Sequence, residues 1–476
     1  MRHVRPALLA CLSILAASAG ADHADDPPSA VSPPIPPDVL VILADDLGCH
    51  DVDFTGGTRG LAPEIDRLAA DSTIFTNAYS DGPNCAPTRA SLLTGLATPQ
   101  HRVITVMSSR RGKAENRRLE PVPNQKLLDK SVPTLPGMLR DAGWRTVHLG
   151  KFHVGDDPAD HGFTDAIGGT SRGHPKSYFS PYLNAALEDG PEGEYLTDRL
   201  ADEAVEILRD VDDSRRLFMY LSFYAVHTPL QARPDLLEKV KVAHPGQSAP
   251  VQKYMAMVMA MDEAVGRVLA AVEDRGRPCL VVFASDNGGL ARISDNGPYR
   301  GSKGMLYEGG IRVPLAVRWP GGSAPSTTDH PVLLRDVAPT ILELAEVDAG
   351  DIEMDGRSFA GIARDDAPPA RPLHWHFPAY LEGGGAAGPW RTTPVAAIRD
   401  GSWKLLQFFE GDRFELYDLA NDPGETNDLA TANEEVVSRL RSKMEAWRSD
   451  VGARLPTPVP VVEDVSSGAD DEKGTQ

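Results

Sequence analysis

The chain contains several short runs of consecutive apolar and β-branched residues, and this feature limits its fold more than any other. Such a run is typical of a strand that is buried on both faces in a parallel sheet. Stretches with helical periodicity lie between the runs, at Pro63–Asp71, Glu194–Asp210 and Val251–Arg275. The alternation predicts an α/β fold, in which helices cover both faces of a mostly parallel or mixed central sheet. The predicted strands are Asp38–Ala44, Trp144–Leu149, Leu217–Phe223, Leu280–Ala284 and Val313–Trp319.

The residues after position 365 follow a different pattern. His374–Phe377, Ala396–Gln407 and Arg413–Tyr417 have the composition of short strands joined by turns, and Asn433–Arg448 has the periodicity of a helix. We therefore predict three parts. These are a main α/β domain over residues 38–365, a smaller α+β C-terminal subdomain with an antiparallel sheet over 366–455, and a polar, Pro-rich disordered tail over 456–476.

The first 19 residues have the pattern of a secretory signal peptide. Two arginines precede the apolar run Ala7–Ala17, and Ala17-Ser18-Ala19 provides a small-x-small cleavage pattern. The apolar run is too short to span a bilayer, which takes roughly 20 residues. We therefore predict a secreted or periplasmic protein without a membrane span, with residues 20–37 as a Pro-rich linker. Leu9-Ala10-Cys11 leaves a lipoprotein signal open as an alternative.

The charge balance argues against one class of partner. The chain has 48 Lys and Arg residues against 68 Asp and Glu residues, a formal net charge of −20. A nucleic acid is not an expected partner, because proteins that bind one present a basic surface. An anionic substrate would have to be held by a local cluster of positive side chains.

The cysteines give a small test of the predicted topology. Cys49 follows the first predicted strand at its carboxyl end, whereas Cys279 precedes the strand Leu280–Ala284 at its amino end. Parallel strands would separate the two thiols by about the length of a strand, at ~3.3 Å per residue. This separation is too large for a disulfide, so we predict that both are free thiols.

Reactive side chains follow four of the predicted strands. Asp45 and Asp46 follow the first strand, and other polar groups follow the next three: Lys151 with His153, His227, and Asp286 with Asn287. Ligands of open α/β sheets bind at the carboxyl ends of the strands. A single aspartate there is commonly a turn or helix cap, but several carboxylates together would repel one another unless a cation were bound. Oxygen ligands of this kind predict a Ca²⁺ or Mg²⁺ site.

The segment Cys85-Ala86-Pro87-Thr88-Arg89, followed by Leu93-Thr94-Gly95, predicts a second feature of the site. Pro87 would begin a helix that ends near Gly95, which places Cys85 just before the helix N-terminus. Unpaired backbone N–H groups at that position favour negative charge, so the site suits an anionic ester and an activated nucleophile. Without this context, an ordinary buried thiol would be the preferred interpretation.

The Cys-x-Pro-x-Arg pattern with Leu-Thr-Gly resembles the signature of the formylglycine-dependent (type I) sulfatases, which are arylsulfatase-like members of the alkaline-phosphatase-like superfamily. Thr88 replaces a commoner Ser and Glu64 a commoner Asn. The resemblance implies that residues 38–365 form a catalytic sulfatase domain and that the protein is a sulfuric ester hydrolase acting on sulfate monoesters. It extends to Asp45–Gly48, Ala62–Leu68, Gly150–Gly155, His227–Pro229, Ser285–Gly289, Arg300–Gly304, Tyr307–Gly310, Val313-Pro314, Leu416–Asp418 and Asp422–Glu425.

The resemblance also implies how the nucleophile and the metal are formed. In this family a maturation enzyme oxidises the cysteine that corresponds to Cys85 to formylglycine, whose hydrate attacks sulfur. One Ca²⁺ polarises a sulfate oxygen and lowers the pKa of the hydrate, and Mg²⁺ would fit the same oxygen ligands. The implied metal ligands are Asp45, Asp46, Asp286, Asn287 and the modified Cys85.

Six side chains have implied catalytic roles, and Cys85 is the first of them. Arg89 and His153 would steady the two hydroxyls of the hydrate. Lys151, Lys303 and His227 would hold the sulfate oxygens where charge develops. His227 would also give a proton to the departing alcohol, and His153 would take one from the remaining hydroxyl, which expels sulfate.

Two further functions stay open beside the sulfatase. The first is a phosphate or phosphonate monoester hydrolase on the same scaffold, and the second is a non-catalytic protein that binds sulfated glycans through an unmodified Cys85. A sulfated polysaccharide is the expected kind of substrate, because the protein is predicted to be secreted. The basic stretch Arg102–Lys126 would either recognise further sulfates of such a polymer or form a solvated loop.

Overall fold

A mixed eight-stranded sheet forms the centre of the structure, which is a computed structural model. Its strand order is β10-β2-β9-β8-β1-β7-β5-β6, and the neighbours β8, β1, β7, β5 and β6 are parallel to one another. This confirms the predicted fold class. The strands are β1 (Asp38–Ala44), β2 (Thr73–Phe75), β5 (Arg145–Gly150), β6 (Asp165–Ile167), β7 (Leu217–Ser222), β8 (Cys279–Ser285), β9 (Leu315–Arg318) and β10 (Ser326–Thr328).

One strand differs from the prediction. The run Val313–Trp319 was expected to form another parallel strand, but β9 runs antiparallel to both β8 and β2. An apolar run indicates that both faces of a strand are buried. A strand in the middle of a sheet is buried in this way whether it is parallel or antiparallel to its neighbours. The direction of β9 was therefore not readable from its composition.

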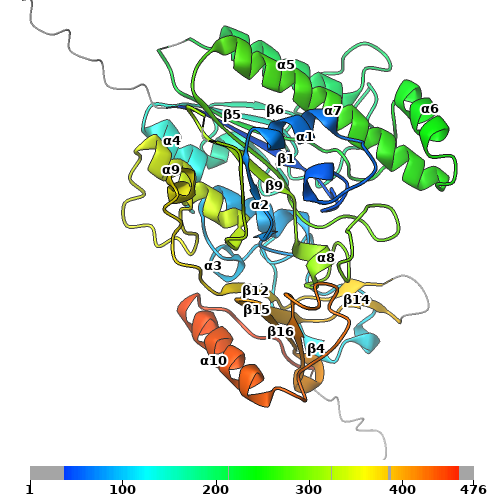
Figure 1. Ribbon diagram of the computed structural model, residues 1–476, viewed down its shortest axis with the longest axis vertical. Helices are drawn as coiled ribbons and strands as arrows, with labels where there is room; N and C mark the ends of the chain where they lie inside the picture. The colour runs from blue at the N-terminus through cyan, green and yellow to red at the C-terminus, as the bar shows by residue number, and fades with distance from the viewer. Residues whose placement is uncertain (1–36, 213, 323, 384–387, 460–476) are drawn as a thin grey trace, which may run out of the picture. The chain divides into compact units, whose positions relative to one another are not determined.

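Helices cover both faces of the sheet (Figure 1). The side chains of β1 alternate between two hydrophobic cores, with Leu40 and Ile42 in the first and Val39 and Val41 in the second. The helices of the first core are α1 (Pro63–Ala70), α5 (Leu196–Asp210), α6 (Pro234–Ala243) and α7 (Ala249–Arg275). Those of the second core are α2 (Cys85–Thr94), α4 (Leu135–Asp141) and α9 (Val337–Ala345).

A second, antiparallel sheet follows in the chain, as predicted. Its strand order is β12-β15-β16-β17, and the predicted run Ala396–Gln407 forms two of these strands, joined by a turn at Gly401. One face packs on helix α10 (Glu434–Asp450), and the other packs on the main part of the chain at Tyr79, Leu306 and Ile311. The four strands are β12 (Leu373–Phe377), β15 (Val395–Asp400), β16 (Trp403–Phe408) and β17 (Arg413–Asp418).

Short elements complete the structure. Helices α3 (Thr98–His101) and α8 (Glu308–Ile311) are four residues long each. Among the described residues, no helix is both long enough and apolar enough to cross a membrane. Three two-stranded pairs are β3 (Ala78–Tyr79) with β11 (Val332–Leu333), β13 (Leu381–Glu382) with β14 (Trp390–Thr392), and β4 (Leu119–Glu120) with β18 (Thr457–Pro458).

The structure describes residues 37–212, 214–322, 324–383 and 388–459. The predicted signal peptide at residues 1–19, almost all of the linker and most of the predicted tail lie outside these ranges. The tail prediction was wrong at its beginning, because Thr457–Pro458 pairs with β4 as strand β18. Backbone pairing at a sheet edge needs no apolar pattern, so the polar sequence gave no sign of it. Both sheets belong to one compact unit, Pro36–Gln476, and the boundary near residue 365 stays a prediction.

The thiol prediction is confirmed. Asp38 at the start of β1 lies opposite Cys279 in the parallel pair β1–β8, whereas Cys49 follows the other end of β1. Both cysteines are free, and so is Cys85.

Candidate active site

The carboxyl ends of adjacent parallel strands place the predicted polar residues side by side. Asp45 and Asp46 follow β1, Asp286 and Asn287 follow β8, and Lys151 follows β5. All five side chains are buried. The backbone holds the strand ends together, because the Asp46 N–H donates to Asp286 Oδ1 at 3.3 Å.

Cys85 is the first residue of α2 and is 1% exposed. The helix therefore begins two residues earlier than Pro87, where the sequence predicted its start, and it ends at Gly95 as expected, in a left-handed conformation. Cys85 Sγ lies 3.5 Å from Asp45 Oδ1, 4.0 Å from Asp46 Oδ1 and 3.3 Å from Lys303 Nζ. The predicted nucleophile thus faces the acidic residues and a lysine.

Two lysines neutralise the aspartates that follow β1. Lys151 Nζ lies 2.6 Å from Asp45 Oδ2, and Lys303 Nζ lies 2.6 Å from Asp46 Oδ1. Asn287 Nδ2 also donates to Asp46 Oδ1, at 2.8 Å. An anionic group that reached Cys85 would lie close to both lysines. The two ammonium groups could then leave the aspartates and bind the oxygens of that anion.

Burial dominates the acid–base properties of this cluster. Burial raises the pKa of Asp45 to about 7, helped by the neighbouring carboxylates Asp286 and Asp46. Burial alone would also raise the pKa of Asp46, but Lys303, His227 and Lys151 together hold it below its ordinary value. The pKa of the Cys85 thiol is raised to about 12, because the thiol is buried and Asp286 is close. An unmodified Cys85 is therefore a protonated thiol at neutral pH and a poor nucleophile.

The donor atoms fit a divalent cation. Ligand atoms of Asp45, Asp46, Cys85 and His227 all lie within 4.8 Å of one another. Within the described residues, Asn287 Oδ1 is a buried acceptor without a hydrogen-bond partner, as expected of an amide oxygen that can coordinate a metal. The sequence predicted Asp45, Asp46 and Cys85 in this set. His227 was not among the predicted metal ligands, because the sequence analysis assigned it to binding the sulfate group and protonating the departing alcohol.

Arg89 joins three parts of the site from inside α2. Its Nε donates to Asp286 Oδ2 at 2.8 Å, and its Nη1 donates to the carbonyl of Lys151 at 2.9 Å and to Ser222 Oγ. The side chain is fully buried. Its guanidinium thereby fixes the ends of β8, β5 and β7 relative to the helix that carries Cys85.

Two histidines lie at the edge of the cluster. His227 Nε2 is 3.6 Å from Asp46 Oδ2, and its Nδ1 is 2.8 Å from the carbonyl of Thr228. Burial lowers the pKa of His227 to about 4 and holds that of His153 well below its ordinary value, with Lys151 and Arg89 adding to the effect at His153. Both rings are therefore neutral at pH 7 and able to accept a proton.

The solvent reaches this site past His227 and Lys303, whose side chains are 17% and 13% exposed. Two residues that the sequence analysis missed lie beside them. His174 stacks on His227 with ring centroids 6.0 Å apart, and Arg391 Nη1 donates to the Lys303 carbonyl at 3.4 Å. Neither residue belongs to a motif, so only the folded chain shows them at this place.

All ten predicted site residues are described, and the structure brings them to one end of the central sheet. Comparison with known proteins adds an independent observation. The profile of the family described as "Sulfatase" matches residues 37–347, and that described as "N-sulphoglucosamine sulphohydrolase, C-terminal" matches residues 300–450.

Individual proteins are similar over most of the chain. A "Sulfatase" of Formosa agariphila is 31% identical, covering 86% of this chain and 88% of the relative. Human "Arylsulfatase A" is 27% identical, covering 85% and 86%. Among solved structures, the complex titled "Ps i-CgsB in complex with k-i-k-neocarrahexaose" has a TM-score of 0.73 and 28% identity, covering 87% of this chain and 93% of the other.

Proposed function

The chain belongs to the sulfatase family and is an arylsulfatase-like sulfuric ester hydrolase, and from this premise we propose that it is a secreted or periplasmic enzyme that removes sulfate from a sulfated carbohydrate. The observation that carries the proposal is the surroundings of Cys85. Two aspartates and the Lys303 ammonium meet at its sulfur atom, in a buried site at the N-terminus of α2. Few structural roles for a cysteine would place it among so many charges.

The nucleophile of the proposed reaction is residue 85 after oxidation of its thiol to formylglycine by a sulfatase-maturating enzyme. The raised pKa of the unmodified thiol supports this modification, because an unmodified Cys85 would be protonated and weakly reactive. When hydrated, formylglycine supplies one hydroxyl for attack on sulfur and a second hydroxyl whose deprotonation releases sulfate. A lone thiol or hydroxyl offers no such release.

The cation of the proposed site is Ca²⁺, with Mg²⁺ as the alternative for the same oxygen donors. Asp45, Asp46, Asp286, Asn287 and residue 85 would hold it. When bound, such an ion supplies Lewis acidity toward a sulfate oxygen and favours the deprotonated nucleophile. The unpaired Asn287 Oδ1 and the raised pKa of Asp45 support this, since a cation would satisfy the first and stabilise the ionised form of the second.

The chain's own residues bind the sulfate group and move the protons. Lys151 and Lys303 turn from the aspartates to the sulfate oxygens and stabilise charge that develops there. His227 is neutral at pH 7 by itself, so it can give a proton to the departing alcohol only after an anionic sulfate beside it has raised its pKa and Nε2 has bound a proton. His153, neutral and buried, accepts a proton from residue 85. Arg89 keeps residue 85 oriented against Asp286.

The residues on the exposed side of the site favour a substrate whose leaving group is large and anionic. An alcohol that takes its proton from His227 must lie beside His174, because the two rings are stacked. Flat, polar rings of this kind suit the face of a sugar, and the exposed Arg391 beside Lys303 suits a second negative group on it. A carbohydrate substrate is also supported by one solved structure similar to this chain, which is a complex with k-i-k-neocarrahexaose.

The basic stretch Arg102–Lys126 lies against the hairpin that carries Arg391, on the exposed side of the site. Arg111 lies 3.9 Å from Glu382 of β13, and a Cβ on Gly112 would lie 2.3 Å from the Trp390 ring of β14. The stretch therefore packs against the hairpin that carries Arg391. Part of its charge is already paired, as Arg110 is with Glu120 and Lys113 with Glu115. We propose that the remaining positive charge contributes to binding of a polymer rather than to the reaction.

A direct test of this function follows residue 85 itself. The chain is expressed with and without a sulfatase-maturating enzyme, and the tryptic peptide Leu68–Arg89 is analysed by mass spectrometry. We expect co-expression to replace the thiol by an aldehyde and to produce hydrolysis of 4-nitrophenyl sulfate. The Cys85→Ala variant, and the unmodified protein, should be inactive.

The same experiment separates the alternatives. Faster turnover of 4-nitrophenyl phosphate than of the sulfate by the matured protein would favour a phosphate ester hydrolase. A thiol that stays unmodified in protein from the native host would favour a protein that only binds sulfated glycans. Removal of the cation by a chelator should abolish turnover, and added Ca²⁺ should restore it.

A further inference from the structure

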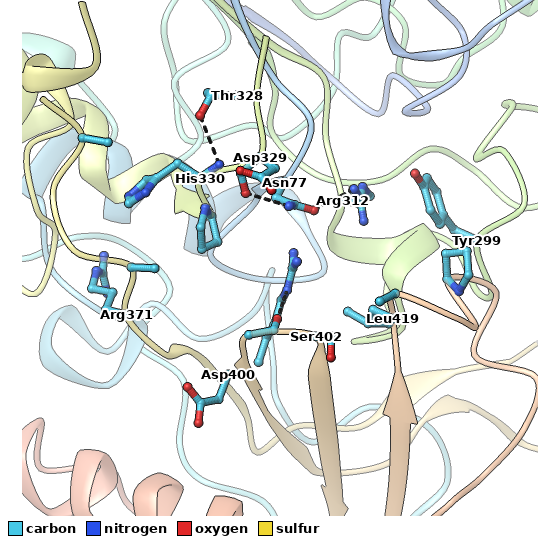
Figure 2. Close-up of a pocket in the computed structure, with 17 residues that line it drawn as sticks. Asn77, Tyr299, Arg312, Thr328, Asp329, His330, Arg371, Asp400, Ser402 and Leu419 are labelled. Carbon is cyan, nitrogen blue, oxygen red and sulfur yellow. Dashed lines mark hydrogen bonds between the residues drawn. The ribbon is translucent and has the colours of Figure 1, made fainter. Parts of the chain in front are cut away.

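A cavity of about 610 Å³ lies between the main part of the chain and the C-terminal sheet (Figure 2). Asn77, Tyr299 and Arg312 form its wall on the main part, and Arg399 and Ser402 belong to the C-terminal sheet. None of the ten residues of the candidate active site lines it. The cavity is therefore a separate feature, and the function proposed above makes no use of it.

The lining of the cavity is basic, although the chain as a whole is strongly acidic. Three arginines line it, Arg312, Arg371 and Arg399, and Arg371 among them is already paired with Asp336 and Asp355. Of the two acidic lining residues, Asp400 is neutralised by Arg439 at 2.7 Å and Lys443 at 2.8 Å, both on α10. Figure 2 shows its carboxylate turned away from Arg312 and toward that helix. Asp329, the other one, is exposed.

A buried cluster of charges behind the cavity contains more cations than anions. Lys404 lies 2.9 Å from both Glu308 and Glu425, and Arg312 lies 2.9 Å from Glu308. Arg399 joins the same cluster through the Tyr79 hydroxyl, which is also bound by Glu308. Three cations thus face two carboxylates, and burial raises the pKa of Glu425 to about 7, so that its charge is incomplete at neutral pH.

Arg399 carries the excess charge. Its side chain is 9% exposed, and it donates only to neutral acceptors, namely the Tyr79 hydroxyl and the Gly401 carbonyl. Within the described part of the chain, no carboxylate lies within 4.0 Å of it. A buried guanidinium without an anionic partner is costly, and an anion in the adjoining cavity would remove that cost.

We infer that this cavity is a second anion-binding site and that its ligand is a sulfate group. Arginine guanidinium groups bind sulfate oxygens through their N–H donors, and within the described residues Arg399 Nη2 makes no hydrogen bond. Both Nη atoms of Arg312 already donate to protein acceptors, so this arginine contributes its positive charge at the cavity wall. The sulfate could be free inorganic sulfate, the product of the proposed reaction, or a sulfate substituent of a glycan chain. Both sources present the same group to the arginines.

The site would also be linked to the active site through the chain. Tyr299 and Arg312 line the cavity, and Lys303 lies between them in sequence. Glu308, which Arg312 holds, begins α8 only five residues after Lys303. A bound anion would therefore hold both ends of the segment that carries this lysine.

The test uses selenate, a heavier analogue of sulfate, on the full chain with Cys85 unmodified. Crystals of the wild type and of Asn77→Asp are soaked in selenate, and the anomalous signal locates each anion. Asn77 Oδ1 accepts from Arg312 and Nδ2 donates to the Asp329 carbonyl, so the substitution places a carboxylate beside that arginine and removes the second hydrogen bond. The variant's crystals also show whether Asp329 keeps its position. Gln247→Glu, an exposed change of the same charge, is the control.

We expect a selenate peak at Arg399, on the side that faces Arg312, in the wild type and the control, and its loss in Asn77→Asp. Calorimetric titration with sulfate at constant ionic strength should show a site that the variant binds about tenfold more weakly or less well still, because a like charge a few Å away opposes the anion. A sulfated oligosaccharide that displaces selenate would identify the glycan as the source, and failure to displace it would identify the free ion.

Two outcomes would overturn the inference: no anion in the cavity of the wild type at saturating selenate, or an equal peak in Asn77→Asp. The result does not depend on the proposed enzymatic function. Unmodified protein has no formylglycine, so an inactive enzyme could still bind selenate in the cavity, and an active one could leave the cavity without an anion.

Discussion

At the scale of single residues, charged side chains in this site are held by partners on other segments. Arg89 lies on α2, but its guanidinium binds Asp286 after β8, the Lys151 carbonyl after β5 and Ser222 at the end of β7. Three acceptors in different directions require the planar fork of arginine. A lysine at the same position has one ammonium group and can satisfy only part of this set.

We therefore predict that Arg89→Lys lowers kcat/KM for 4-nitrophenyl sulfate by about 100-fold, since losing charge-assisted hydrogen bonds worth about 2–3 kcal/mol costs that factor. Steady-state kinetics of the matured variant would measure the effect. Arg140→Lys, the same change at an exposed arginine, should leave the rate within about twofold. Equal rates for the wild type and Arg89→Lys would contradict the positioning role.

Arg391 gives a second prediction at this scale. Its side chain is exposed and contacts the Lys303 backbone, so it can bind an anionic group of a substrate that the active site has already engaged. We expect Arg391→Gln to raise KM for a multiply sulfated oligosaccharide by about tenfold at low salt, while kcat/KM for 4-nitrophenyl sulfate stays within about twofold. Lys113→Gln, an exposed cation paired with Glu115, is the matched control. A uniform loss on both substrates would point to disturbed catalysis instead.

At the scale of elements, the sequence predicted which strand ends carry the site. It did not predict the loops and hairpins that pack around those strand ends. Asp46 and Asp286 meet as the sequence led us to expect, because parallel strands bring their carboxyl ends to one edge of the sheet. His174 and Arg391 were not predicted, because they reach the site from loops and hairpins whose packing no local pattern encodes. The direction of β9 was missed for the same kind of reason, since strand pairing is decided by distant segments.

Helix α1 shows such distant support, and it yields a prediction. Its own N-cap residue, Ala62, has no capping side chain, and Asp262 of α7 accepts from the backbone N–H groups of Glu64 and Ile65 instead, at 3.2 and 2.8 Å. We expect Asp262→Ala to lower the free energy of unfolding by about 1–2 kcal/mol, as loss of a helix cap does. Urea denaturation would measure it, with the exposed Asp274→Ala on the same helix as the control.

The pH dependence of this effect has a definite sign. Burial raises the pKa of Asp262 to about 7 in the folded chain, from an ordinary value of 3.8. Between these values the folded state binds the proton more tightly than the unfolded state, so this residue's contribution to stability falls as pH rises from about 4 to 7. The difference between the wild type and Asp262→Ala should therefore be larger at pH 5 than at pH 8. The opposite trend would show that the ionised carboxylate is the better cap.

At the scale of the whole molecule, the C-terminal sheet is connected to the active-site segment by buried charge. Lys404 of β16 lies 2.9 Å from Glu308 at the start of α8 and 2.9 Å from Glu425, and all three side chains are buried. The sequence analysis noted the segments that contain both glutamates but gave them no role. Their partner, Lys404, lies in a strand with no motif, so the connection could be found only after folding.

We predict that Lys404→Met lowers the free energy of unfolding by about 3–5 kcal/mol, because it leaves Glu425 buried without a cation and removes one of the two cations beside Glu308. The exposed pair Lys443–Asp400 offers a control, and Lys443→Met should cost at most about 1 kcal/mol. The loss should also depend on pH. Burial already raises the pKa of Glu425 to about 7 while Lys404 opposes the rise, so without Lys404 the folded state would keep the proton to still higher pH.

Because the unfolded chain releases that proton near its ordinary pKa of 4.5, the folded variant holds more protons than the unfolded one across the neutral range, and its stability falls as pH rises. The deficit of Lys404→Met relative to the wild type should therefore grow from pH 5 to pH 8 in chemical denaturation. Turnover by the matured variant should decrease as well, since Glu308 follows Lys303 by five residues in the segment that Lys404 anchors. A variant with full activity and an unchanged unfolding midpoint at pH 8 would show that this charge cluster does not couple the C-terminal sheet to the active site.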